Sequence, residues 1–235
     1  MMPRGLFVTG TDTEVGKTVA SVALLHALAG AGIRAAAMKP VASGSERTAA
    51  GLRNADALAL QSAAGLRVPY EAVNPYPFGP AIAPHIAARE AGVRIGFDRI
   101  LDGFEALSRG ADLVLVEGVG GWRVPLGPDG DVARLARLLD LPVVLVVAVG
   151  LGCISHARLT AESIQACGAR LAGWIANFPR AGGARLEDQL QTLESCLPAP
   201  CLGRLPWSRE PLDASLGRAI DVGALTGESG REERA

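Results

Sequence analysis

The stretch Thr9-Gly-Thr-Asp-Thr-Glu-Val-Gly-Lys-Thr18 decides the fold of this chain. It follows a short apolar run at residues 5–8 and precedes a helical pattern over residues 17–30. A strand, a loop that ends in Gly-Lys-Thr and a helix form the arrangement that cradles nucleotide phosphates. Backbone N–H groups at the start of a helix and the positive end of its dipole favour an anion there. We therefore expect Lys17 to reach the β- and γ-phosphates of a nucleotide and the Thr18 hydroxyl to hold Mg²⁺.

The loop departs from the common pattern G-x-x-x-x-G-K-[ST] at one position. That pattern has glycine at position 11, whereas this chain has Thr11, and Gly10 stands one residue earlier. The loop is therefore one residue longer than the pattern. The alternative is an ordinary turn between a strand and a helix with a solvated Lys17, which leaves the Thr-, Asp- and Glu-rich loop unexplained.

Composition narrows the classes of protein that remain. The chain has 235 residues, of which 49% are hydrophobic and 20% charged, so it can bury the core of one large α/β domain or of two small ones. A net charge of −1 without a long basic run argues against a nucleic-acid partner. The longest apolar run, residues 142–149, is of strand length, whereas a membrane helix needs about 18 consecutive apolar residues. Without an export signal at the N-terminus, we expect a cytoplasmic protein with no membrane contact and reduced cysteines.

The four cysteines and three histidines have no spacing that is typical of a metal site. We therefore assign no metal ligand among them.

Six apolar segments of strand length alternate with helical patterns. The expected strands are residues 5–10, 35–39, 112–117, 142–149, 171–177 and 201–204. The expected helices are residues 17–30, 54–65, 97–109, 131–139, 156–167 and 184–196. This alternation predicts the α/β class, a single-domain P-loop NTPase-like fold with a mostly parallel sheet and helices on both faces. We expect the domain to span residues 1–226 and the polar residues 227–235 to form a flexible tail.

Residues 68–84 are rich in proline, so no regular helix is expected there. Because the segment also carries tyrosine and phenylalanine, we interpret it as a shaped surface loop rather than a disordered one.

Ligands of open parallel sheets bind beyond the carboxyl ends of the strands, so polar residues just after strands are the candidates. Glu117 ends an expected strand, where a carboxylate can hold a metal, and the glycines after it permit either close approach of a ligand or a tight turn. Asp56 opens an expected helix and is either a second carboxylate or a helix-start residue. Lys39 ends another strand, where it could stabilise a transferring phosphoryl group or simply be solvated. Asn177 could read an adenine edge or form an Asx turn.

Several ordered motifs together resemble dethiobiotin synthetase, the ATP-dependent ring-closing enzyme of biotin synthesis. The matching stretches begin at residues 7–18, 39–44, 52–58 and 116–122 and continue at residues 151–157, 172–177 and 203–207. The resemblance implies a homodimeric ligase that forms carbon–nitrogen bonds, with ATP as co-substrate and Mg²⁺ as cofactor. One amine of 7,8-diaminononanoate would capture CO₂ as a carbamate, which would attack ATP, and the second amine would close the ring of dethiobiotin and release phosphate.

The resemblance also implies the site. Lys39 would be the catalytic lysine beside Lys17, and Thr18, Asp56 and Glu117 would coordinate Mg²⁺. The nucleotide would contact Thr13, Glu14, Val15, Gly16, Lys17, Thr18, Asp56, Glu117, Gly118, Val119, Gly120, Asn177, Phe178, Pro206, Trp207, Ser208 and Asp213. The diamine or its carbamate would contact Ser43, and its carboxylate would meet the uncharged turn formed across the dimer interface by Gly152, Cys153, Ile154 and Ser155.

Three positions depart from the pattern of this family. Val119 stands where alanine is frequent and would crowd the substrate pocket. Gly150 replaces a frequent lysine and Ser155 a frequent asparagine, and both changes bear on the affinity for the substrate carboxylate.

Two other P-loop classes are the alternatives. A switch ATPase of the partitioning type carries a signature lysine five residues before the P-loop lysine, and this chain has Asp12 there. An amidating enzyme of cobalamin synthesis brings a glutamine-hydrolysing domain, for which this chain has no room.

Overall fold

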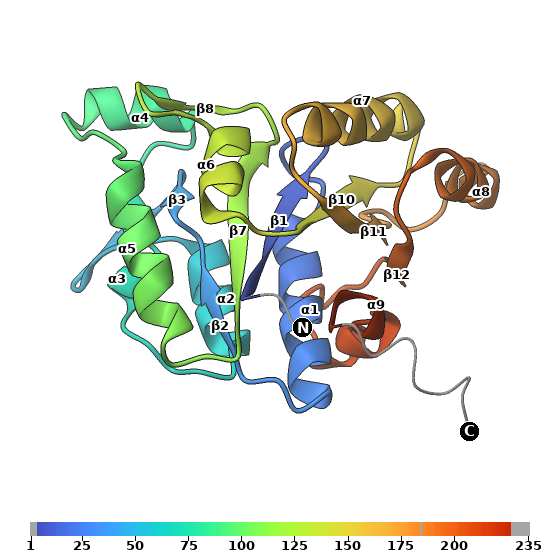
Figure 1. The fold of residues 1–235 in the computed structure, drawn as a ribbon, viewed down its shortest axis with the longest axis horizontal. Coiled ribbons are helices and arrows are strands. Elements are labelled where there is room, and N and C mark those ends of the chain that lie inside the picture. Colours follow the sequence, from blue (N-terminus) through green and yellow to red (C-terminus); the bar gives the residue numbers. More distant parts are fainter. Residues whose placement is uncertain (1–3, 184, 227–235) are drawn as a thin grey trace.

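The computed structural model describes residues 4–183 and 185–226. Its centre is a six-stranded sheet in the order β12-β11-β10-β1-β7-β2, in which every neighbouring pair of strands is parallel (Figure 1). The strands are β1 (Gly5–Gly10), β2 (Ala35–Met38), β7 (Leu113–Gly121), β10 (Val143–Ala148), β11 (Leu171–Asn177) and β12 (Cys201–Leu205). The predicted α/β fold with a parallel sheet is confirmed.

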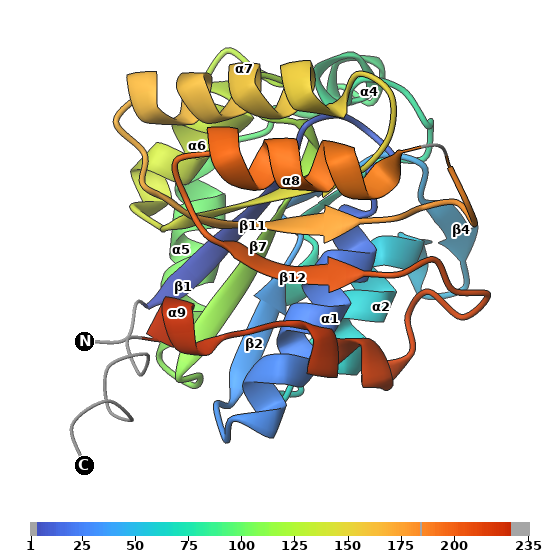
Figure 2. The same cartoon turned by 90° about the vertical axis from the view of Figure 1, so that its right-hand side faces the viewer.

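Helices cover both faces of this sheet (Figure 2). On β1, Leu6 and Val8 pack into the core that includes α1, whereas Phe7 points into the core on the opposite face. Because the strands are buried on both faces, they are apolar almost without interruption. The longer helices are α1 (Lys17–Gly30), α2 (Ala55–Ala63), α5 (Phe97–Ser108), α6 (Val132–Leu139), α7 (Cys153–Ala166) and α8 (Leu186–Cys196).

Short elements between them had no signal in the sequence pattern. The short helices are α3 (Tyr70–Val73), α4 (Pro84–Glu90), η1 (Ala214–Ala219) and α9 (Gly223–Thr226). The short strand pairs are β3 (Val41–Ala42) with β6 (Tyr76–Pro77), β4 (Glu46–Thr48) with β5 (Gly51–Arg53), and β8 (Pro125–Gly127) with β9 (Gly130–Asp131).

Two expected boundaries were wrong at the ligand edge of the sheet. β7 continues past Glu117 to Gly121, because Gly121 still pairs with Gly10 after a shift in register. Helix α7 begins at Cys153 rather than at residue 156, since Gly152 takes the left-handed conformation with φ 90° and forms the N-cap.

The proline-rich segment also differs from the expected irregular loop. A single helical turn, α3, follows Pro69, which stays outside the helix as its N-cap with an extended backbone (φ −56°, ψ 146°). Tyr76–Pro77 then pairs with Val41–Ala42, so the segment is built into the structure beside Lys39.

No helix in the part of the chain that the structure describes is long and apolar enough to cross a membrane. The expected tail at residues 227–235 lies outside the described residues.

Candidate active site

The phosphate loop joins β1 to α1 and is held by a side chain from β11. Gly16 forms the N-cap of α1 with φ 88°, and the Asn177 side-chain amide donates a hydrogen bond to the carbonyl of Val15 (2.9 Å). A Cβ atom on Gly16 would lie 2.1 Å from the Asn177 nitrogen, so only glycine fits this turn. Glu14 is also left-handed, with φ 60°. A non-glycine residue in this conformation stores strain, which is frequent at ligand sites.

Lys17 lies in the mouth of this loop, with only 7% of its surface exposed. Its ammonium group donates a hydrogen bond to the carbonyl of Asp12 (2.9 Å). Burial lowers the pKa of Lys17 to about 8, and the charge of Glu117 offsets part of this effect. Polyanionic phosphates would favour the charged form of such a lysine.

Lys39 bridges the two carboxylates that the sequence singled out. Its ammonium nitrogen lies 2.6 Å from Glu117 Oε1 and 2.7 Å from Asp56 Oδ2. Burial by itself lowers the pKa of Lys39, but the two carboxylates outweigh it and hold the pKa above its ordinary value. Burial also raises the pKa of Asp56, yet the Lys39 ammonium outweighs it and holds the pKa of that carboxyl below its usual range. Thr18 joins the group by donating its hydroxyl hydrogen bond to Glu117 Oε1 (3.0 Å).

Lys17 and Lys39 are the only two lysines in the sequence. Both are buried in this one site. A lysine ammonium is a compact point charge with three donors on a flexible stem, so it can contact several oxygen atoms at once.

The group formed by Thr18, Asp56 and Glu117 fits Mg²⁺. Glu117 is fully buried, and its Oε2 atom makes no hydrogen bond with any residue that the structure describes. Mg²⁺ prefers oxygen ligands and is usually held by one or two carboxylates together with waters and substrate phosphates. Nowhere in residues 4–183 and 185–226 do three or more His, Cys, Asp or Glu side chains gather to hold a metal. The ion would therefore depend on nucleotide oxygens to complete its coordination.

A cavity of about 720 Å³ opens over these groups. It brings together expected site residues from the phosphate loop, the start of α1, the loop after β2, α2 and β7, namely Thr13, Glu14, Gly16, Lys17, Thr18, Lys39, Ser43, Asp56, Val119 and Gly120. The Ser43 hydroxyl is buried without a hydrogen-bond partner among the described residues, which leaves it free for a ligand. Apolar side chains also line this cavity. They include Val124, which the sequence analysis missed, and four residues at the end of the proline-rich segment, namely Ala81, Ile82, Ala83 and Pro84.

Some expected residues do not line the cavity but lie in the structure around it. Val15 is a buried residue of the phosphate loop. Gly118 lies against Phe7 and Val132, where a Cβ atom would come within 3.3 Å of both side chains. Glu117 contacts Lys39 and Thr18 from the sheet.

The residues expected around the nucleoside lie outside this cavity. Phe178 and Pro206–Ser208 follow β11 and β12, at the same edge of the sheet as the phosphate loop. Trp207 is 45% exposed, and the Asp213 carboxylate caps η1 by accepting a hydrogen bond from the Ser215 N–H group (2.8 Å).

The residues expected to meet the substrate carboxylate start α7, away from the cavity of the same chain. Cys153 is buried and its thiol lies 3.4 Å from Gln189 Oε1, whereas Leu151, two residues earlier, is fully exposed. Gly152, Ile154 and Ser155 belong to this same helix start, so the predicted turn is a helix N-terminus.

Three further residues near the site were missed by the sequence analysis, namely Asn54, Tyr70 and Asn74. They form buried hydrogen bonds behind Lys39. The only local signal was the position of Asn54 before a helix, which is typical of an N-cap.

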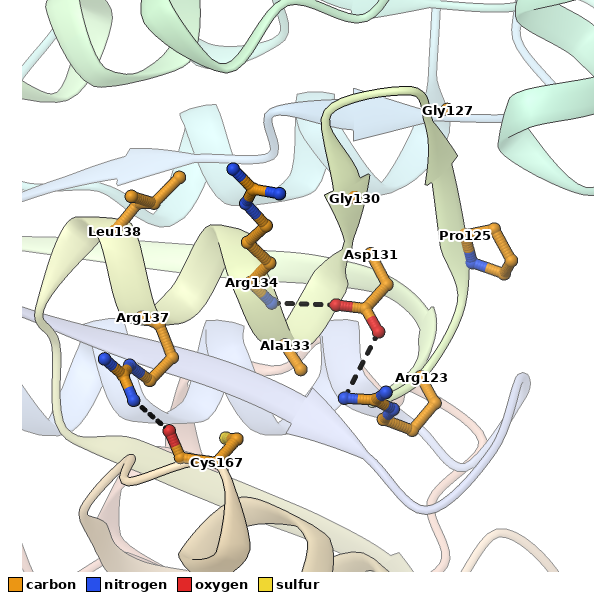
Figure 3. A pocket seen from close by; sticks show the side chains of 10 residues that line it. All are labelled: Arg123, Pro125, Gly127, Gly130, Asp131, Ala133, Arg134, Arg137, Leu138 and Cys167. Atoms are coloured by element: carbon orange, nitrogen blue, oxygen red, sulfur yellow. Dashed lines mark hydrogen bonds and ion pairs between the residues drawn. The ribbon is translucent and has the colours of Figure 1, made fainter.

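A second cavity, of about 680 Å³, lies between the β8–β9 hairpin and α6 (Figure 3). Its arginines point in different directions: Arg123 pairs with Asp131 (3.3 Å), and Arg137 donates to the carbonyl of Cys167. Without convergent polar groups, it is less suited to phosphates than the cavity over Lys17 and Lys39.

Comparison with known proteins agrees with this geometry. Residues 4–214 match a protein family described as an AAA domain. The ATP-dependent dethiobiotin synthetase of Pseudomonas aeruginosa (strain UCBPP-PA14) is 56% identical over 220 residues, which are 93% of this chain and 96% of that protein. A dethiobiotin synthetase of Escherichia coli (strain K12) is 50% identical over 225 residues, which are 95% of this chain and 100% of that protein.

Solved structures extend the similarity to the fold alone. The septum site-determining protein MinD from Pyrococcus horikoshii OT3, complexed with Mg-ADP, has a TM-score of 0.58 at 16% identity and covers 99% of this chain and 98% of its own. MinD from Aquifex aeolicus has a TM-score of 0.56 at 14% identity, with 93% and 88% covered. Because relatives at 50–56% identity match almost from end to end, this chain belongs to the ATP-dependent dethiobiotin synthetase family.

Proposed function

We propose that this protein is a cyclo-ligase that uses ATP and CO₂ to convert 7,8-diaminononanoate into dethiobiotin, ADP and phosphate. The observation that carries the proposal is one cavity that is lined by two lysines, the Asp56 carboxylate, the phosphate loop and a group of apolar side chains. An apolar wall suits the aliphatic chain of the diamine, and the charged floor suits phosphates and a carbamate.

In this proposal the backbone N–H groups of the phosphate loop and Lys17 hold the β- and γ-phosphates. Thr18, Asp56 and Glu117 hold Mg²⁺, which supplies charge neutralisation on the phosphate oxygens when it is bound. Asn177 and Phe178 would lie near the base, and the remaining nucleotide contacts would come from Gly118, Val119, Gly120, Pro206, Trp207, Ser208 and Asp213. Asn177 already uses one amide hydrogen on Val15, so reading a base would need its remaining amide atoms.

The reaction needs three steps. One amine of the diamine adds to CO₂ and loses a proton to become a carbamate. A carbamate oxygen attacks the γ-phosphorus of ATP, the bond to ADP breaks, and a carbamic–phosphoric mixed anhydride forms. The second amine attacks the carbamate carbon, loses a proton and expels phosphate, which closes the cyclic urea. Lys39 would stabilise the negative charge on the carbamate and on the transferring phosphoryl group, and Ser43 would orient the carbamate.

The mixed anhydride must be protected from water. Ala81, Ile82 and Ala83, at the end of the proline-rich segment, line the same cavity as the phosphate loop. We assign this wall the role of excluding water while ring closure proceeds.

A homodimer in the cytoplasm is part of the proposal. Helices α6 and α7 cover the same face of the sheet, and three leucines on or near them are exposed. They are Leu138 (48%) on α6, Leu151 (104%) before α7 and Leu159 (62%) on α7. Exposed leucines of this kind suit a contact with a second copy, which would bring the start of α7 to the partner's cavity. There the substrate carboxylate would meet backbone N–H groups near Ser155. Gly150 would add no positive charge at this place, unlike the lysine that is frequent in the family.

Phosphate release from Mg·ATP, with and without diaminononanoate plus bicarbonate, tests the proposal alongside mass detection of dethiobiotin. We expect phosphate and dethiobiotin in equal amounts, only with the diamine. ATP hydrolysis that does not depend on the diamine would favour the partitioning-type switch ATPase.

A further inference from the structure

A buried chain of hydrogen bonds lies directly behind the candidate active site. The Asn54 N–H group donates to the Tyr70 hydroxyl oxygen (2.8 Å), and the Tyr70 hydroxyl donates to Asn74 Oδ1 (2.9 Å). Asn74 Nδ2 then donates to the carbonyl oxygen of Lys39 (2.7 Å). Asn54, Tyr70 and Asn74 are 5%, 7% and 1% exposed, so water competes little for these groups.

One end of the chain holds the start of α2 and the loop that carries Ser43. Asn54 Oδ1 accepts the N–H group of Ala57 (3.2 Å), which makes Asn54 the N-cap of α2. Its side-chain nitrogen donates to the carbonyl of Ser43 (3.2 Å). Asp56 is the second residue of α2, so Asn54 orients both Asp56 and Ser43.

At the other end of the chain of hydrogen bonds, the backbone of Lys39 is held on both sides of its Cα atom. The Lys39 N–H group donates to the carbonyl of Val73 (2.8 Å), and the Lys39 carbonyl accepts from the Asn74 side chain. Both partners come from the turn at residues 70–74. This turn therefore clamps the point from which the flexible lysine stem reaches Asp56 and Glu117.

We propose that Tyr70 and Asn74 are positioning residues, which set the place of the Lys39 ammonium relative to Asp56 and Glu117. The Tyr70 hydroxyl is the only link between the α2 end and the Lys39 end of this hydrogen-bond chain. The effect that we expect on turnover rests on the proposed function. The effect that we expect on the position of the Lys39 side chain does not.

Tyr70→Phe removes the hydroxyl and retains the ring. Asn54 N–H and Asn74 Oδ1 then lose a buried partner, so Asn74 is free to turn away from Lys39. A shift of about 1 Å in a reacting group can lower turnover about 100-fold, and we expect kcat to fall by about 10- to 100-fold. The KM for Mg·ATP should change less than kcat, because no hydrogen bond that the structure describes joins Tyr70 or Asn74 directly to the phosphate loop. Asn74→Ala should act in the same way.

Tyr76→Phe is the matched control. Tyr76 belongs to the same proline-rich segment and is 6% exposed. Its hydroxyl accepts the N–H group of Gly96 (3.1 Å), and among the residues that the structure describes it makes no hydrogen bond to Lys39, Val73 or Asn74. This variant loses an equally buried hydroxyl but should retain kcat.

A spectroscopic readout separates positioning from general loss of stability. Because the sequence has only two lysines, NMR of lysine labelled at the ε-carbon yields two signals, which Lys39→Met assigns. We expect Tyr70→Phe to move the Lys39 signal and leave the Lys17 signal in place, and Tyr76→Phe to move neither.

The outcomes are decisive in both directions. A full kcat in Tyr70→Phe, an unmoved Lys39 signal, or an equal loss of kcat in Tyr76→Phe would overturn the inference. If the wild-type protein makes no dethiobiotin, the proposed function fails, and the Lys39 signal alone still decides whether Tyr70 positions this side chain.

Discussion

Replacing Lys39 with methionine should destabilise the free protein far more than the same change at Lys17. Lys39 has 5% of its side chain exposed and contacts Glu117, which has none exposed. Lys17 is similarly buried but makes no ion pair with any residue that the structure describes, and burial lowers its pKa to about 8. Both variants remove one positive charge from the same cavity. The protein raises the pKa of Lys39 and lowers that of Lys17, so the two losses should differ in size.

The expected size follows from the burial of each partner. Removing one partner of a buried ion pair costs about 3–5 kcal/mol, because the other charge stays buried alone. Asp56 has 45% of its side chain exposed, so its pairing with Lys39 contributes only up to about 1 kcal/mol. Glu117 dominates, and we expect Lys39→Met to lower the free energy of unfolding by about 3 kcal/mol. For a chain of this length the loss corresponds to about 6–12 °C in Tm. Lys17→Met should cost about 1 kcal/mol or less, since one hydrogen bond is lost.

The pH dependence has a definite sign. The pKa of Lys39 is raised, so its contribution to stability is complete below its unfolded pKa of about 10.4 and is lost as the pH rises through the folded value. The pKa of Asp56 is lowered, so its contribution is present above its unfolded value of about 3.9 and is lost as the pH falls through the folded pKa. The gap between wild type and Lys39→Met should therefore be level around neutral pH and narrow in acid.

Urea unfolding at several pH values measures this gap. Adding Glu117→Gln to Lys39→Met should recover stability, because the uncompensated charge disappears. Mg²⁺ should raise the Tm of Lys39→Met more than that of wild type, since the ion can replace the missing ammonium between the carboxylates. A loss below about 1 kcal/mol for Lys39→Met, which is the value of an exposed pair, would refute the reasoning.

Three further predictions follow from the same geometry. The NMR signal of the Lys17 ε-carbon should titrate near pH 8 in the free protein. Bound ATP should raise the pKa of Lys17, so that ATP binding at about pH 9 takes up a proton. Equal calorimetric heats of binding in buffers of different ionisation enthalpy would contradict this proton uptake. Gly16→Ala should abolish nucleotide binding and cost about 1–3 kcal/mol, because φ 88° and the close Asn177 amide both oppose a Cβ atom, whereas Gly30→Ala, which meets no atom within 4 Å, serves as the control. Ile82→Ser should raise phosphate release that is not matched by dethiobiotin, and coupling that stays complete would remove Ile82 from the water-excluding wall.

The sequence predicted the six central strands and the longer helices because each rests on a local pattern. Two predicted boundaries failed for reasons that the hydrophobic pattern does not contain. β7 runs on to Gly121 because β1 is there to pair with it, and α7 begins early because Gly152 adopts a left-handed conformation. The turn at residues 70–73 and its contacts had no periodic signal, since proline-rich segments have no repeat that reports their partners.

The candidate site divides in the same way. Lys17 and Thr18 could be placed from the sequence alone, because the loop that holds phosphate is continuous in the chain. The meeting of Lys39, Asp56 and Glu117 depends on the order of strands, which places β7 between β1 and β2 and so brings their carboxyl ends together. Hydrophobic periodicity specifies which residues are buried but not which strand lies beside which. The bridging of both carboxylates by one lysine, and the buried chain that clamps that lysine, were therefore decided by the tertiary structure.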